Sequence, residues 1–576
     1  MWLLKVADSC GARRFVLYAH ISHQNADAAF QKKCYLVTTT AMAYSKTPKS
    51  KFCYSRWLPA SAGNHGYGRI IGPIGNDRNS HSSYRALMKQ ITFLFTILFT
   101  MALAAQAQVK FDDYFVSKTL RIDYYHIGDA TSELITLDEV YEYDGWAGSK
   151  KNLIDPFNNG AYYYKVYDVA SGNPIFSRGF DSYFKEYQTT TKAIEGTKRT
   201  YHESAIIPRP KAPIRFVIEK RDRYGKMNEV FAETVDPNDL YVIKEKPQQP
   251  GTKVFRSHTG GDPSRSVDIV ILGDGYSAAE QKKFEKDLKR YSELFLNQEP
   301  YRRHRNKFNI SGIFQPSEES GIDEPGANIY KRNALGTRFY SLGSERYVLT
   351  EENKAMRDLA AHVPYDAIYI MCNTPRYGGG GIYNLYSTFS ADNQFGGYVF
   401  LHEFGHSFAG LADEYYTSDV AYNDFYPEGV EPAEPNLTRL MNPENVKWKH
   451  LQEPGIQLPT PWDKEEYDAM DLAWQKERRE LNSRIAELKR TNAPEREIIR
   501  AQEEYAKKDK ERSERADRLL KTIPYVGKVG AFEGGGYASK GIYRPMVDCL
   551  MFTKGIKPFC KVCEEHMEKV IKHFTD

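Results

Sequence analysis

The sequence has little net charge, few cysteines and no long apolar run. The formal net charge is +4 over 576 residues, which leaves no electrostatic footprint for nucleic-acid binding. The apolar run at 91–103 is shorter than the ~20 residues that a membrane-spanning helix needs. We therefore expect no nucleic-acid partner and no stable membrane anchor.

The short apolar run instead belongs to a predicted secretory signal peptide at 88–107. Lys89 precedes the run, and Ala-Gln-Ala at 105–107 forms a small-x-small cleavage site before Gln108. The residue directly after that site is Gln108 rather than a cysteine, so a lipid-anchored form is not expected. Residues 1–87 show no sustained periodicity, and we interpret them as disordered sequence translated from DNA upstream of the true start codon. The remaining chain is predicted to be secreted or periplasmic.

The scarcity of cysteine limits the metal sites that the sequence can form. The chain has seven cysteines, and Cys-x-x-Cys occurs once, at Cys560 and Cys563. Without a second pair of this kind, a four-cysteine zinc site is not expected. In an oxidising compartment we expect a disulfide between Cys549 and either Cys560 or Cys563.

What the sequence does have is a large number of aromatic residues, with 41 Tyr and 30 Phe. In 108–250 they lie in alternating or β-branched segments separated by Gly, Asn, Asp and Pro, which predicts an N-terminal β-sandwich. A polar linker at 244–253 follows. The segments are TLRIDYYHIG (119–128), AYYYKVYDV (161–169) and PIRFVIEKRDRYG (213–225).

Strands and helices then alternate, so the fold class is predicted to be α+β, with an α/β domain at 251–576. Segments 267–272 and 367–371 read as buried strands. Between them, Ser277 and Glu280 form a capping box that opens a helix through about Leu296.

An inserted helical hairpin is predicted at 463–521. This stretch is dense in Lys, Arg and Glu, and its apolar residues recur at helical spacing. Asn492-Ala-Pro494 breaks the run into two helices. We interpret the charge as a solvated surface rather than a binding patch.

The chemistry is concentrated at His402, Glu403 and His406. Two histidines four positions apart lie on one face of a helix, where both imidazoles can hold one zinc ion. Glu403 lies beside them and can take a proton from water that the zinc activates. Because the surrounding helix is apolar, two unrelated surface histidines are a poor alternative.

A catalytic zinc ion usually takes three protein ligands. Gly410 can end the helix in a left-handed conformation, after which Asp413 or Glu414 can turn back to the metal. We prefer Asp413 because it is closer to the turn. The weaker alternatives are Asp419 and Asp424.

This pattern resembles the metzincin signature His-Glu-x-x-His-x-x-Gly-x-x-His, with two departures. Gly410 comes one residue late, and Asp413 replaces the last histidine. Both fit the secreted bacterial zinc metallopeptidases of the IgA-peptidase family, with which the chain shares further segments. They are DIVILGDGY (268–276), YGGGGI (377–382), PNLT (435–438), KWK (447–449), EGGGY (533–537), YRP (543–545), DCLM (548–551) and FCKVC (559–563).

The resemblance implies a metzincin-like fold and additional site residues. Met551 is expected to form the Met-turn beneath the zinc, with Met546 as the alternative. An edge strand containing Gly380, Gly381 and Ile382 is expected to bind the substrate backbone by strand addition. The candidates for an oxyanion-stabilising tyrosine are Tyr415 and Tyr543.

The sequence thus predicts a secreted zinc endopeptidase that acts on protein or peptide substrates, with Glu403 activating the water. One alternative is a secreted protein that binds glycans or proteins and carries a degenerate metal site. The presence of His402, Glu403 and His406 together argues against it. Another alternative is a zinc hydrolase that acts on a non-peptide bond.

Overall fold

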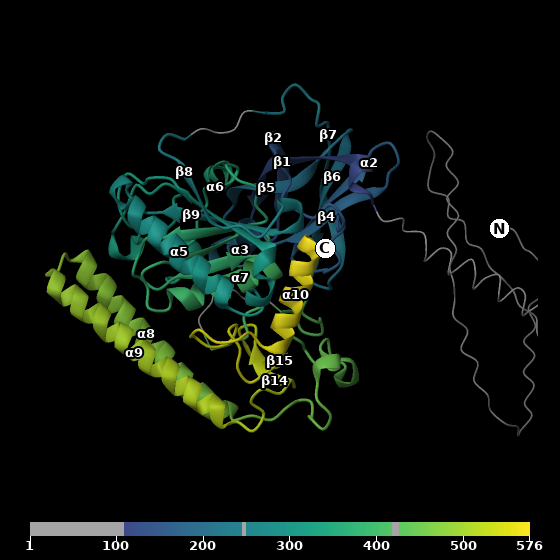
Figure 1. Cartoon of the computed structure of the whole chain (residues 1–576). Helices are drawn as coiled ribbons and strands as arrows, with labels where there is room; N and C mark the ends of the chain where they lie inside the picture. Colours follow the sequence, from purple (N-terminus) through teal and green to yellow (C-terminus); the bar gives the residue numbers. More distant parts are fainter. Residues whose placement is uncertain (1–108, 245–248, 418–425) are drawn as a thin grey trace, which may run out of the picture. The chain divides into compact units, whose positions relative to one another are not determined.

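The structure is a computed structural model that describes residues 109–576 apart from 245–248 and 418–425 (Figure 1). The predicted upstream extension and signal peptide lie outside the described residues. The described part is a mixture of sheets and helices, which confirms the α+β class. None of the helices in it combines the length and the apolar character needed to cross a bilayer.

The first described segment forms two antiparallel sheets that share one core. Their strand orders are β2-β1-β5 and β4-β3-β6-β7. Alternate residues of β6, namely Ile214, Phe216 and Ile218, are buried in this core, because successive side chains of a strand point to opposite faces. The strands are β1 (Phe115–Gly128), β2 (Glu133–Asp144), β3 (Tyr162–Asp168), β4 (Pro174–Phe180), β5 (Arg199–Pro210), β6 (Ile214–Arg221) and β7 (Met227–Val235).

The second segment is built on a six-stranded mixed sheet of order β12-β13-β11-β9-β10-β8. The four middle strands are parallel, and each edge strand is antiparallel to its neighbour. Every residue of β9 and β11 is buried, as expected for strands covered on both faces. The strands are β8 (Lys253–His258), β9 (Val267–Asp274), β10 (Phe308–Phe314), β11 (Ala367–Cys372), β12 (Gly379–Ile382) and β13 (Tyr386–Ser390).

Helices cover both faces of this sheet. Ile269 and Ile271 of β9 face the core formed with α5, α7 and α10, whereas Val270 and Leu272 face α6. The predicted capping box is confirmed: Ser277 N donates to Glu280 Oε2 at 2.9 Å, just before α5. The helices are α5 (Gln281–Asn297), α6 (Asn353–Ala360), α7 (Gly396–Ala409) and α10 (Lys561–Thr575).

The two segments share buried contacts. Short helices of the first segment place Tyr183 and Tyr187 in the same apolar cluster as Val270 and Leu272 of the large sheet. Hydrogen bonds add to this junction, as between Asn159 Nδ2 and the Gly410 carbonyl at 2.9 Å. The short helices are α2 (Phe111–Tyr114), α3 (Tyr183–Gln188) and α4 (Thr191–Ile194).

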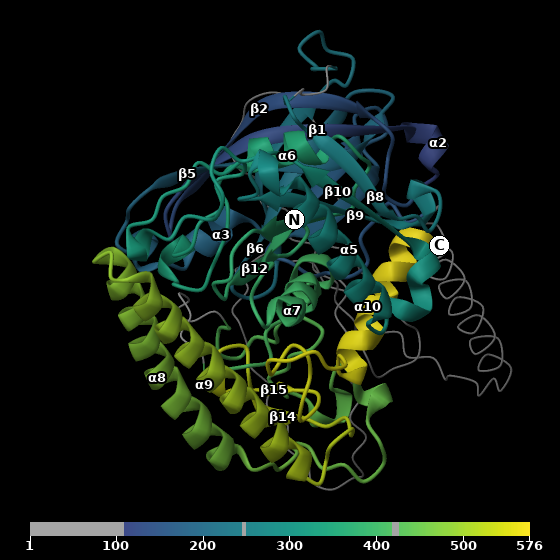
Figure 2. The same cartoon turned by 60° about the vertical axis from the view of Figure 1, so that its left-hand side comes forward.

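Two long helices, α8 (Lys464–Arg490) and α9 (Glu495–Thr522), lie side by side as an antiparallel pair (Figures 1 and 2). Ion pairs connect this pair to the large sheet's segment, as between Lys554 Nζ and Asp509 Oδ2 at 2.9 Å. A two-stranded hairpin, β14 (Phe532–Gly535) and β15 (Ala538–Arg544), follows them. The domain boundaries that we draw from the sequence remain predictions.

Candidate active site

Helix α7 is a buried helix with a left-handed end. Nearly all of its residues are buried, including His402, and Gly410 follows it with φ 57°. Gly410 N donates to the His406 carbonyl at 2.9 Å, and Leu411 N donates to the Gly405 carbonyl at 3.0 Å. This confirms the predicted glycine end of the helix. The chain therefore reverses immediately after the two histidines.

The reversal brings Asp413 back to the histidines. Asp413 Oδ1 lies 2.9 Å from His402 Nε2 and 3.2 Å from His406 Nε2, and the two Nε2 atoms are 3.1 Å apart. Ligand atoms of a tetrahedral zinc site are separated by about 3.3 Å when each bond is near 2.05 Å. The three atoms thus have the spacing of one face of such a site.

The other ring nitrogens hold the two imidazoles in orientation. His402 Nδ1 donates to the Leu550 carbonyl at 3.0 Å, and His406 Nδ1 donates to the Leu411 carbonyl at 2.6 Å. A carbonyl oxygen can only accept, so each Nδ1 carries a hydrogen. The lone pair of each neutral ring is then on Nε2, where a metal ligand needs it.

The electrostatics of the group follow from burial and from mutual contact. Burial favours neutral forms, but Asp413 outweighs it at His406 and raises the pKa of that ring to about 9. Burial also acts to raise the pKa of Asp413, yet the two histidines hold it well below its usual range. The Asp413 carboxylate is therefore strongly stabilised as an anion.

Glu403 lies beside the two histidines and within reach of the same point. Burial raises the pKa of its carboxyl group, while His402 and His406 act in the opposite direction. A half-buried carboxylate with a raised pKa is well suited to accept a proton and pass it on.

A tyrosine and an arginine that the sequence did not single out complete the surroundings. The Tyr537 hydroxyl, at the turn of the β14–β15 hairpin, donates to Asp413 Oδ2 in a short hydrogen bond. Arg346 Nη2 donates to the Tyr415 hydroxyl at 2.9 Å. Of the two tyrosines that are candidates for oxyanion stabilisation, Tyr415 lines the cavity and Tyr543 is not among the lining residues.

The methionines of the predicted Met-turn occupy different places. Met551 is fully buried against α7: a Cβ atom added to Gly405 would lie 2.8 Å from its sulfur. Gly405, which lies between His402 and His406 in the sequence, thus leaves the space that the Met551 side chain occupies. The sulfur of Met546 instead accepts a hydrogen bond from Lys561 N at 3.3 Å, at the start of α10.

The glycines of β12 are explained first by α7. A Cβ atom at Gly381 would lie 2.4 Å from the Glu403 carbonyl oxygen, and one at Gly379 would lie 2.4 Å from Val399. The absence of side chains therefore lets the edge strand pack against the histidine helix. Gly380, Gly381 and Ile382 all line the cavity beside Glu403.

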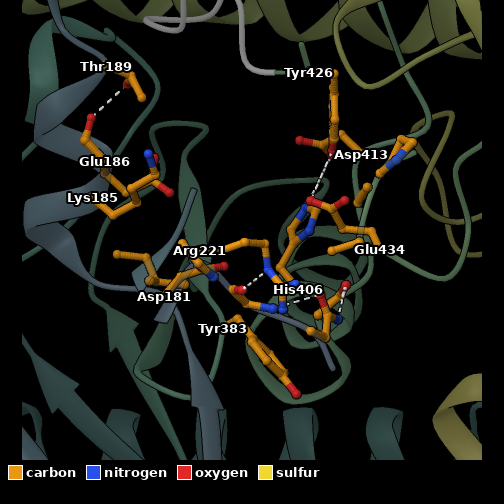
Figure 3. Close-up of a pocket in the computed structure, with 18 of the residues that line it drawn as sticks. Asp181, Lys185, Glu186, Thr189, Arg221, Tyr383, His406, Asp413, Tyr426 and Glu434 are labelled. Carbon is orange, nitrogen blue, oxygen red and sulfur yellow. Dashed lines mark hydrogen bonds and ion pairs between the residues drawn. The ribbon is translucent and has the colours of Figure 1, made fainter. Parts of the chain in front are cut away.

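A large cavity of about 1290 Å³ opens in front of these residues. The first segment contributes one wall, with Asp181, Lys185 and Arg221 opposite His406 and Asp413 (Figure 3). The cavity is larger than the roughly 300–1,000 Å³ of typical small-molecule pockets, so it has room for an extended peptide of several residues.

The remaining predicted ligands are not at this site. The Glu414 carboxylate contacts cysteines instead of the histidines, and Asp419 and Asp424 lie outside the described residues. The predicted disulfide is wrong in this structure: Cys549, Cys560 and Cys563 are free thiols, and Cys549 Sγ is 3.9 Å from Cys563 Sγ. A bonded pair would be about 2.0 Å apart.

Two histidines one helical turn apart, an adjacent glutamate and a carboxylate that closes the set are the donor arrangement of metal-dependent peptidases. Comparison with protein families agrees with this class. The family described as IgA Peptidase M64 matches residues 256–571, and the Peptidase M64 N-terminus family matches residues 110–232. The chain belongs to the IgA Peptidase M64 family, so the resemblance predicted from the sequence is confirmed. No curated protein matches the chain.

Proposed function

We propose that the protein is a secreted zinc-dependent endopeptidase with a metzincin-like catalytic site. The observation that carries this proposal is the convergence of His402 Nε2, His406 Nε2 and Asp413 Oδ1 within 3.2 Å of one another at the cavity. Two imidazoles and one carboxylate are ordinary ligands for a catalytic zinc ion.

The donor set fits zinc because each member has support that holds it in place. Both histidines donate from Nδ1 to backbone carbonyls, and the Asp413 carboxylate accepts from Tyr537. When bound there, zinc supplies a Lewis acid that polarises a peptide carbonyl and lowers the pKa of water to about 7.

Glu403 is proposed as the general base and then the general acid. Its carboxylate takes the proton from the attacking water, and the same oxygen returns it to the leaving amine. The raised pKa of Glu403 makes the second transfer easier, because the protonated form is not strongly disfavoured.

The substrate is proposed to lie in the cavity as an extended chain along β12. This strand is an edge of the six-stranded sheet, and beyond a single bridge between Gly379 and Tyr347 its outer side pairs with no other named strand in the described part of the chain. An extended peptide can pair with such an edge by backbone hydrogen bonds. Met551 is proposed as the apolar residue beneath the metal.

The test is the substitution Glu403→Gln, with hydrolysis of a protein substrate and metal content measured in parallel. We expect activity to fall by about 10²- to 10⁴-fold, the range for loss of a general base, with the metal content unchanged. Full activity in this variant would refute the proposed mechanism.

Detection of the chain in culture medium or periplasm, cleaved before Gln108, tests the proposed export.

A further inference from the structure

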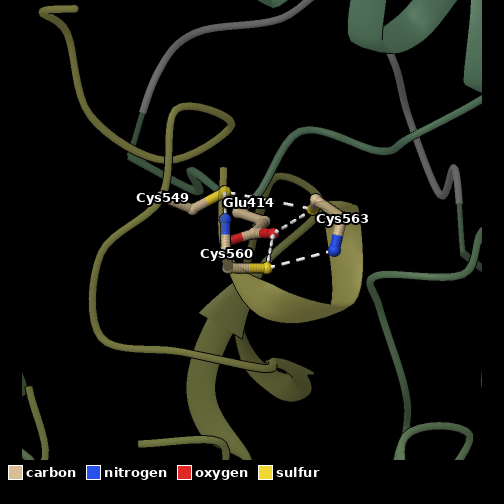
Figure 4. A group of neighbouring side chains, drawn as sticks. All are labelled: Glu414, Cys549, Cys560 and Cys563. Carbon is tan, nitrogen blue, oxygen red and sulfur yellow. Dashed lines mark hydrogen bonds between the residues drawn. The ribbon is translucent and has the colours of Figure 1, made fainter. Parts of the chain in front are cut away.

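A second cluster of potential ligands lies away from the cavity, where α10 begins. It consists of the side chains of Glu414, Cys549, Cys560 and Cys563, whose ligand atoms all lie within 4.8 Å of one another (Figure 4). All four residues are at most 2 % exposed, and none of them lines the large cavity. We propose that this cluster is a second, structural metal site that holds a zinc ion.

The distances support tetrahedral coordination. Cys549 Sγ lies 3.9 Å from Cys563 Sγ, and Glu414 Oε1 lies 3.7 Å from Cys560 Sγ and 3.2 Å from Cys563 Sγ. In a tetrahedral zinc site, two sulfur ligands are separated by about 3.8 Å, and a sulfur and an oxygen by about 3.6 Å. These three pairs are therefore within about 0.4 Å of coordination spacing, and all four ligand atoms lie within 4.8 Å of one another.

Backbone N–H groups orient the sulfur atoms of Cys549 and Cys560. Cys549 Sγ accepts from Cys560 N at 3.1 Å and from Met551 N at 3.4 Å, and Cys560 Sγ accepts from Cys563 N at 3.4 Å. These N–H donors fix Cys549 and Cys560 in one arrangement, as outer hydrogen bonds do at metal sites.

Glu414 gives an independent reason for a cation. Its Oε2 atom is buried and has no hydrogen-bond partner among the described residues. Leaving a carboxylate oxygen buried without a partner is costly, and a zinc ion between Glu414 and the three sulfurs would remove that cost. Three cysteines and a carboxylate are an acceptable donor set for zinc.

The site would also act on the catalytic centre through two short connections. Asp413 and Glu414 are adjacent, and Glu414 N donates to the Met551 carbonyl at 2.9 Å. On the other side, Cys549 is followed by Leu550, whose carbonyl orients His402. A metal that joins Glu414 to Cys549 would hold both segments and so position His402 and Asp413.

The test measures metals per chain in the purified full chain and in matched variants. We expect two zinc ions in the wild type, one in Asp413→Ala and one in Cys560→Ser. Cys372→Ser is the control, because Cys372 is equally buried on β11 but lies outside both clusters, and it should keep two. A metal-free Asp413→Ala chain that remains folded would overturn the proposal.

A spectroscopic measurement does not depend on variants that lack a residue of the cysteine cluster. In cobalt-substituted protein, three thiolate ligands should produce an intense sulfur-to-cobalt charge-transfer band, and Glu403→Gln should leave it unchanged. A mercurial thiol reagent should release one metal ion per chain. Absence of the band, or a disulfide among Cys549, Cys560 and Cys563 in the unreduced protein, would contradict the proposal.

Discussion

The two ligand clusters use adjacent residues of one segment but differ in their access to solvent. Asp413 faces the cavity with His402 and His406, whereas Glu414 faces the sealed cluster of cysteines. In the proposed assignment, the histidine site lies at the cavity with room for water and a peptide, and the cysteine site would be closed by four protein ligands. Open coordination suits catalysis and closed coordination suits structure, so neighbouring carboxylates in one chain can serve different purposes.

The largest effect is expected where the open site loses a ligand. Asp413→Ala removes the carboxylate that contacts both histidines, and we expect peptidase activity to fall by about 10³-fold or more, because several kcal/mol of transition-state stabilisation are lost. Activity and metal content of the folded variant check this. Wild-type turnover in the variant would show that Asp413 is not a ligand.

The matched change at the closed site should affect stability instead. Glu414→Ala leaves three cysteines without their fourth partner, and we expect a loss of about 3 kcal/mol or more in the free energy of unfolding. Denaturant titration with and without a chelator checks this. If the chelator lowers wild-type stability no more than that of Glu414→Ala, the distinction between the two sites fails.

A smaller effect is expected from the residue that supports the open site from outside. Tyr537→Phe removes the hydrogen bond to Asp413, and we expect metal affinity or activity to fall by about 10- to 100-fold. Tyr543→Phe is the control on the same hairpin, since Tyr543 does not line the cavity. Equal losses in both variants would indicate a general effect on the hairpin.

The contact between α7 and Met551 joins the two sites, because Gly405 lies between the two histidines and Met551 lies two residues after Cys549. Gly405→Ala places a methyl group 2.8 Å from the Met551 sulfur, and we expect a loss of about 1–3 kcal/mol in the free energy of unfolding. In a double-mutant cycle with Met551→Ala, the two effects should not add. Additive losses would mean that Gly405 and Met551 do not compete for the same space.

The smallest effect concerns a buried carboxylate that belongs to neither cluster. Burial, followed by the charge of Asp366, raises the pKa of Asp268 at the start of β9. Because this pKa is raised in the folded state, the contribution of Asp268 to the free energy of unfolding is fully present below the ordinary pKa near 4. It is lost as the pH rises through the folded-state pKa. The free energy of unfolding of Asp268→Asn should therefore rise relative to that of the wild type by on the order of 1 kcal/mol between about pH 5 and about pH 9. Parallel stability curves for the two proteins would contradict this.

Local patterns in the sequence were sufficient for the parts of the fold and site that depend on neighbours along the chain. The α7 histidines, the glycine end of that helix and the return of Asp413 to the histidines lie within twelve residues. The capping box before α5 and the burial of β9 follow from similarly short patterns.

Features made by distant residues were not predictable in this way. Tyr537 meets Asp413 across 124 positions, and Cys563 meets Glu414 across 149. The turn at Gly410 favours Asp413 over Glu414 as the ligand that returns to the histidines, but no local pattern brings Glu414 to cysteines so distant in sequence. The glycines of β12 were recognised as a site of close approach, but the neighbour is α7 rather than a substrate alone.

The shared apolar cluster at the junction of the two segments limits how far the enzyme can be shortened. Truncating the chain to the part that carries the histidines would remove Tyr183 and Tyr187 from the apolar cluster that contains Val270 and Leu272, and would remove a wall of the cavity. Such a fragment would expose an aggregation-prone surface even with every ligand intact. A minimal catalytic unit of this protein therefore has to begin with its N-terminal strands.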